Sequence, residues 1–90
     1  MKTIHKYVLA HCNNEISAPS GAIPLTVQYQ ENALCVWMEV QESNPLVRRR
    51  ILVVGTGFQI DEEMRYIGTV QEPPFVWHVY DGGELYVDTR

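Results

Sequence analysis

A run of three arginines is the most distinctive candidate for chemistry in the sequence. Arg48, Arg49 and Arg50 lie inside a long stretch of β-branched and aliphatic residues. In an extended strand, Arg48 and Arg50 point to one face and Arg49 points to the other. The first pair therefore forms a small positive stripe, which could bind an anion. The simplest interpretation is an exposed stripe that pairs with acids such as Glu39 or Glu42.

A threonine between two glycines ends the same stretch. Gly55, Thr56 and Gly57 lack the lysine, the third glycine and the following helix of nucleotide-binding loops, so the segment is typical of a strand-ending turn. Glycine backbone amides can nevertheless form a nest for an anion. If the loop lies near the guanidinium groups of Arg48 and Arg50, a phosphate would meet two kinds of donor.

Aromatic residues are the second candidate for binding. Tyr29, Trp37, Tyr66, Trp77 and Tyr80 are more aromatic mass than the core of a 90-residue chain needs. Aromatic residues combined with arginines are typical of interface centres and of pockets that stack a base. Trp37 and Trp77 are flanked by aliphatic residues and are expected to pack, whereas Tyr80 is expected at a contact surface. The predicted ligand-binding or partner-binding residues are Arg48, Arg50, Gly55, Thr56, Gly57, Tyr66, Trp77, His78 and Tyr80.

The sequence contains no pattern of residues that predicts catalysis. His5, His11 and His78 are far apart in the chain, which disfavours a metal site. Cys12 and Cys35 show neither redox nor zinc-binding spacing and are expected to be free thiols. No nucleophile motif such as Gly-x-Ser-x-Gly occurs. We therefore expect no catalytic residue, no metal and no cofactor, and the protein is not expected to be an enzyme.

Short alternating runs separated by turn residues predict a mostly all-β fold. The alternation and the hairpin turns favour a small antiparallel β-sandwich or an open barrel of six to seven short strands, with at most one helical turn. The expected strands are Thr3–Leu9, Glu15–Ala18, Ile23–Gln30, Ala33–Val40, Leu46–Gly55, Arg65–Gln71 and Phe75–Tyr80. Glu31 and Asn32 are expected to form a two-residue hairpin turn, and Asp81–Gly83 to turn the chain back through Leu85–Val87.

Length and composition limit the function classes. Ninety residues with 46% apolar and 20% charged side chains predict one domain over 1–90, with its core in 2–80 and a C-terminal turn and extension in 81–90. The net charge of −4 has the wrong sign for a nucleic-acid-binding domain. No apolar run is long enough to span a membrane or to form a signal peptide, so a cytoplasmic location is expected. Unpaired sheet edges in so small a domain also predict a homo-oligomer.

Several blocks of the sequence together resemble one family. The blocks are Lys2–Tyr7, Leu34–Trp37, Arg49-Arg50, Val54–Gly57, Tyr66–Gln71 and Val76–Val79. In combination they resemble a family of small uncharacterised proteins, a domain of unknown function encoded by tailed bacteriophages and prophages. The resemblance covers most of 1–80, residues 83–90 extend past it, and Phe58–Ile60 departs from its Gly-His-Pro-like continuation.

The resemblance implies a phage origin and favours a binding function. Small phage proteins outside the virion often disable a host factor, so the first hypothesis is a non-catalytic accessory protein that binds and inhibits a host protein, as a counter-defence factor in the host cytoplasm. The second is a sponge that holds a nucleotide-type signal between subunits, with Arg48, Arg50 and the glycine loop at the phosphates and Tyr66 or Trp77 stacking on the base. The third is a structural or virion-associated module.

Overall fold

Seven β-strands and no helix make up the part of the chain that the structure describes. The structure is a computed structural model, and it describes residues 1–85. The strands are β1 (Lys2–Leu9), β2 (Asn13–Pro19), β3 (Ile23–Gln30), β4 (Ala33–Gln41), β5 (Leu46–Gly55), β6 (Arg65–Glu72) and β7 (Phe75–Leu85). The segment between β5 and β6, where one helical turn was allowed for, is a loop with two turns.

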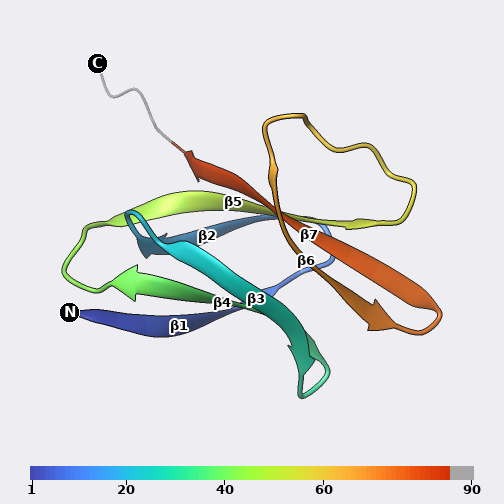
Figure 1. The fold of residues 1–90 in the computed structure, drawn as a ribbon, viewed down its shortest axis with the longest axis horizontal. Helices are drawn as coiled ribbons and strands as arrows, with labels where there is room; N and C mark the ends of the chain where they lie inside the picture. The colour runs from blue at the N-terminus through green and yellow to red at the C-terminus, as the bar shows by residue number, and fades with distance from the viewer. Residues whose placement is uncertain (86–90) are drawn as a thin grey trace.

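The strands form two antiparallel sheets that pack as a sandwich (Figure 1). One sheet has three strands in the order β1-β4-β3, and the other has four in the order β2-β5-β7-β6. The loop that follows β5 extends from the right-hand side of the molecule in Figure 1. The expected all-β sandwich is confirmed.

Alternation along the central strands builds the core between the sheets. In β4, every second residue faces the four-stranded sheet and is buried, as the period-2 geometry of a strand requires. The buried apolar residues of the core are Leu9, Ala18, Ala22, Val27, Leu34, Val36, Met38, Val40, Ile51, Val53 and Val79. Both sheets contribute residues to this single core.

The hairpin turn between β3 and β4 has the expected position and conformation. Glu31 and Asn32 have φ values of 51° and 65°, and two consecutive residues in this region form the turn type whose twist matches a two-residue hairpin. The sequence prediction at this turn is confirmed.

The expected turn at Asp81–Gly83 is wrong, because β7 continues through it to Leu85. The glycines serve a β-bulge instead: Arg50 on β5 pairs with Gly83 and the next residue of β5 pairs with Asp81, which leaves Gly82 as the extra residue. A Cβ atom on Gly82 would lie 3.1 Å from the Cβ of Arg50, so a glycine there lets the arginine lie across the bulge. Leu85 ends β7, and residues 86 and 87 of the expected return strand lie outside the described residues.

A buried ion pair fastens the two central strands to the turn between β2 and β3. Arg49 points into the sandwich and donates from Nε to Asp81 Oδ1 (3.1 Å), from Nη2 to Asp81 Oδ2 (2.5 Å) and from Nη1 to the carbonyl of Ala22 (2.6 Å). Asp81 Oδ1 also accepts a hydrogen bond from the Gly83 amide at 2.8 Å. The guanidinium thus donates one hydrogen bond to each oxygen of the Asp81 carboxylate. This bidentate geometry best offsets the free-energy cost of burying the carboxylate charge.

Candidate functional site

The predicted binding residues separate into two neighbouring groups. One group projects from the outer face of the four-stranded sheet, because the alternate residues of the same strands are buried in the core. Its members are Arg48, Arg50, Tyr66, His78 and Tyr80. The other group lines a cleft where β5 ends and consists of Gly55, Thr56 and Trp77, while Gly57 follows in the loop.

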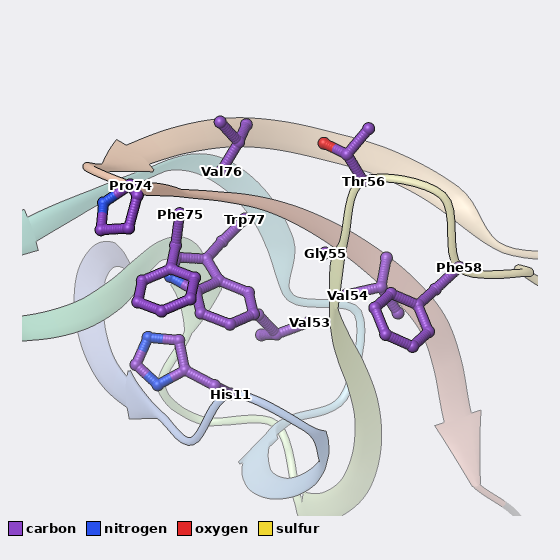
Figure 2. A pocket seen from close by; sticks show the side chains of 10 residues that line it. All are labelled: His11, Val53, Val54, Gly55, Thr56, Phe58, Pro74, Phe75, Val76 and Trp77. Carbon is purple, nitrogen blue, oxygen red and sulfur yellow. The ribbon is translucent and has the colours of Figure 1, made fainter.

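The cleft is an apolar hollow of about 710 Å³ between segments that are distant in the sequence (Figure 2). The end of β5 and the loop after it form one wall, the start of β7 forms the other, and the β1–β2 loop contributes a histidine. The lining residues are His11, Val53, Val54, Gly55, Thr56, Phe58, Pro74, Phe75, Val76 and Trp77. The volume is within the usual range for sites that bind small molecules or side chains.

Aromatic rings stack along one side of the cleft. The Trp77 ring lies 4.5 Å from the ring of His11 and 5.6 Å from the ring of Phe75, centroid to centroid, and Figure 2 shows the three rings side by side. Across the cleft, Phe58 lies over Gly55, where a Cβ would come within 3.3 Å of the phenylalanine ring. Phe58 is 72% exposed and Phe75 is 54% exposed, and exposed apolar rings gathered around one hollow are typical of interaction sites.

A chain of hydrogen bonds holds two of these rings in place. The Tyr29 hydroxyl donates to Glu72 Oε1 at 3.0 Å, and Trp77 Nε1 donates to the same oxygen at 3.3 Å. The Tyr29 hydroxyl has only one hydrogen, so its contact with His11 Nε2 requires that the histidine donate. Burial, followed by the hydrogen bond and the charge of Glu72, raises the pKa of Tyr29 to about 12. These hydrogen bonds thus fix the positions of the Trp77 and His11 rings.

A second hydrogen-bond chain joins the rim of the cleft to the outer face of the sheet. Thr56 Oγ1 lies 2.8 Å from His78 Nε2, and His78 Nδ1 lies 3.0 Å from Thr69 Oγ1. Thr69 in turn contacts the Tyr66 hydroxyl at 2.6 Å, and the Tyr66 ring meets the Tyr80 ring edge-on at 5.5 Å. Among the predicted site residues, the structure therefore connects Thr56, His78, Tyr66 and Tyr80.

The arginine stripe is not next to the glycine loop. Arg50 is five residues before Gly55 on the same extended strand, which corresponds to about 16 Å. Arg50 donates to Asn13 Oδ1 at 2.8 Å and lies 3.5 Å from Asp61. The arginine stripe and the loop amides consequently do not converge on one anion.

The expected pairing of the arginine stripe with Glu39 or Glu42 is wrong. Arg48 pairs with Glu15 at 2.9 Å, because β2 is the neighbour of β5 in the sheet. Glu39 pairs with Lys2, and Glu42 lies 3.3 Å from His5. Both acids belong to the other side of the sandwich.

Sequence reasoning missed the three other aromatic rings of the cleft, those of His11, Phe58 and Phe75. His11 reaches Trp77 only because the β1–β2 loop folds against β7. Phe58 did leave a signal, since it is a large apolar residue beside turn residues rather than inside an alternating run. Phe75 begins an expected strand and gave no signal beyond that of a strand residue. Trp77 packs against the core as expected and also lines the cleft, whereas Trp37 lies outside the core on the outer face of the three-stranded sheet.

The three histidines remain apart in the structure. His5 contacts Glu42, His11 contacts Trp77, and His78 lies between two threonines. Within residues 1–85, no group of three or more histidine, cysteine, aspartate or glutamate side chains is placed to hold a metal ion. The same residues include no helix of the length and apolarity that a membrane crossing requires. Cys12 is exposed, Cys35 is buried, and both are free thiols.

A family model described as a domain of unknown function, DUF7352, matches residues 1–88 of the chain. The match extends past Tyr80, where the sequence resemblance was expected to end. No curated protein and no solved structure matches the chain.

Proposed function

Given a chain that belongs to DUF7352, a family of domains of unknown function, we propose that it is a non-catalytic binding protein that docks a partner protein. The partner inserts an apolar side chain into the cleft beside Trp77. The observation that carries this proposal is the aromatic cleft itself, whose Trp77 ring is fixed by Glu72 and whose rim exposes Phe58 and Phe75. Pre-positioned aromatic anchors reduce the entropy cost of association.

The lining of the cleft favours an apolar side chain over a nucleotide. The residues that line it include no arginine or lysine, and phosphate groups bind best where cations or several amides converge. A nucleotide base could still stack on Trp77, so the nucleotide sponge is retained as the second candidate. Its phosphates would extend to the Gly55–Gly57 amides without help from Arg48 or Arg50.

The sheet face beside the cleft extends the proposed interface. Tyr66, Tyr80, Arg48 and Arg50 project from that face, and Tyr and Arg, together with Trp, are the residue types most enriched among energetically dominant interface residues. A partner that fills the cleft would also cover part of this face.

The resemblance to small phage and prophage proteins supports a more specific form of the proposal. In that form the partner is a host protein, the encounter takes place in the host cytoplasm during infection, and binding inhibits the host factor as counter-defence. A structural or virion-associated role is the third alternative, and it would place the protein in purified particles.

A peptide selection tests the docking proposal directly. Wild-type protein is screened against a random peptide library and, separately, against linear and cyclic nucleotides by thermal shift. We expect selected peptides to share an aromatic or large aliphatic anchor. Phe58→Ala and Phe75→Ala should each weaken their binding by about tenfold or more, because each removes more than about 1.4 kcal/mol of contact.

Leu46→Ala is the matched control, since Leu46 is an equally exposed apolar residue away from the cleft. It should bind the peptides like wild type. The docking proposal fails if the selected peptides bind the phenylalanine variants as well as they bind wild type. A nucleotide that stabilises the protein by about 2.7 kcal/mol at 100 times its Kd would instead support the sponge.

A further inference from the structure

The outer face of the three-stranded sheet carries a second apolar surface, in the layer opposite the cleft. Ile4 and Val8 on β1 and Ile23 and Leu25 on β3 are all large apolar residues and all exposed there. Together with Trp37 on β4, Ile4 and Leu25 line a shallow hollow of about 290 Å³. A solvated outer face of an antiparallel sheet is normally polar, so this surface is unusual for a monomer.

The register of the sheet arranges this face in three rows that run across the strands. Each row takes one outward residue from β1, β4 and β3. The rows are Ile4, Glu39 and Ile23; Lys6, Trp37 and Thr26; and Val8, Cys35 and Gln28. The apolar residues therefore lie on both flanks of the face, and the tryptophan lies at its centre.

We propose that this face is the two-fold interface of a homodimer, in which the three-stranded sheets of two copies stack face to face. A two-fold axis in the interface, parallel to β4, places β1 of each copy over β3 of the other. Ile4 then lies over Ile23 of the second copy, and Trp37 lies over Trp37 of the second copy. An isologous contact needs such a self-complementary surface.

The charges on the face select this axis over the perpendicular one. With the axis across the strands, Lys6 would lie over Lys6 of the second copy, and like charges that face each other are unfavourable. With the axis along β4, Lys6 lies over Thr26 instead. Glu39 then lies over Glu39 of the second copy, but Lys2 of the same copy lies 3.3 Å from each of these carboxylates and neutralises it, whereas Lys6 hydrogen-bonds the neutral Gln30.

The size of the face indicates a weak, reversible dimer. Three strands about 4.8 Å apart and about eight residues long give a footprint of roughly 400 Å² on each copy. That is about half of the area each partner buries in a standard stable interface. The two clefts would lie on the outward layers of the dimer, so a dimer could engage two partner molecules at once.

Sedimentation velocity over a wide range, from low micromolar to near millimolar protein, tests this interface without any partner. We expect the native chain to shift from monomer to dimer as its concentration rises. Ile4→Lys should raise the dimer dissociation constant at least tenfold. Leu46→Lys makes the same charge change at a residue that is 69% exposed on the other sheet, compared with 56% for Ile4, and should dimerise like wild type.

Folding of both variants is checked by circular dichroism, since both substitutions are on the surface. A native chain that stays monomeric over the whole range overturns the proposal, and so does an equal loss of dimer in Leu46→Lys and Ile4→Lys.

NMR chemical-shift changes on dilution distinguish face-to-face stacking of the sheets from edge-to-edge pairing of strands. Stacking moves the signals of the Trp37 indole and the Ile23 methyl groups, whereas changes confined to the backbone amides of β1 would show edge-to-edge pairing and also overturn the proposal.

Discussion

At the scale of single residues, one carboxylate holds two aromatic side chains at the cleft. Glu72 accepts hydrogen bonds from both Tyr29 and Trp77, so its charge orients the tryptophan and also favours the protonated form of the tyrosine. The pKa of Tyr29 is raised to about 12, first by burial and then by Glu72. The ionisation of Tyr29 is therefore linked to the stability of the fold.

We expect the protein to lose stability as the pH rises from about 10 to about 12. In this window Tyr29 keeps its proton in the folded state, while the unfolded chain, with the ordinary tyrosine pKa of 10.0, has lost it. The unfolded state binds fewer protons, so the free energy of unfolding falls with pH. Urea unfolding at pH 9 and pH 11 measures the loss.

Glu72→Gln is the control for this linkage. Removing the carboxylate charge should bring the pKa of Tyr29 back towards 10, which absorbance of tyrosinate near 295 nm can follow. If the wild type and Glu72→Gln show the same tyrosine titration, the assigned role of Glu72 is incorrect.

The buried pair Arg49–Asp81 offers a second test at this scale. Arg49→Met should lower the free energy of unfolding by about 3–5 kcal/mol, because it leaves the Asp81 carboxylate buried without its partner. Arg48→Met is the matched control: the Arg48–Glu15 pair is exposed, and its loss should cost less than about 1 kcal/mol. Urea denaturation compares them, and equal costs would contradict the structural role of Arg49.

If Arg49→Met does not fold, the double variant Arg49→Met with Asp81→Leu provides the measurement. The double variant replaces the ion pair by two apolar side chains, so no unpaired carboxylate stays buried. Its free energy of unfolding should therefore be higher than that of Arg49→Met alone. A double variant as unstable as the single one would show that the charge is not the cause.

At the scale of elements, β6 of one sheet packs closely against β3 of the other. A Cβ atom on Gly68 would lie 2.8 Å from Cγ2 of Val27, a buried and β-branched core residue. The register of β6 against β7 shifts beside Gly68, so the strand bends at this point. Glycine is thus required here by close approach to the other sheet.

Gly68→Ala should lower the free energy of unfolding by about 1–3 kcal/mol, the usual cost of overpacking a core. The cause can be checked with a double-mutant cycle, since Val27→Ala removes the clashing methyl groups. The cost of Gly68→Ala should become smaller in the Val27→Ala background. Additive costs would mean that the two residues do not compete for the same space.

At the scale of the whole molecule, the two sheets share one core and should unfold together. The chain has one tryptophan on each sheet, Trp37 on β4 and Trp77 on β7. The variants Trp37→Phe and Trp77→Phe each leave one tryptophan as a reporter. In each variant, the midpoint of the fluorescence transition should coincide with the midpoint by circular dichroism. Separate midpoints would show that one sheet can melt alone.

The sequence alone determined the features that depend on neighbouring residues. Period-2 alternation placed the strands, with β3 and β5 at their observed bounds, and Glu31-Asn32 at the hairpin turn. It also put Arg49 on the same face as Ile51 and Val53, which was a signal of its burial. These features were predictable because strand alternation and turn conformation are local properties of the backbone.

Tertiary structure decided what depends on which strands are neighbours. The glycines after Asp81 suit a turn or a bulge equally well, and only the pairing of β7 with β5 makes them a bulge. Arg48 meets Glu15 because β2 lies beside β5. The cleft exists because three distant segments converge, which brings His11 onto Trp77. Such contacts are set by long-range pairing and by packing between the sheets, and the local pattern of the sequence does not record them.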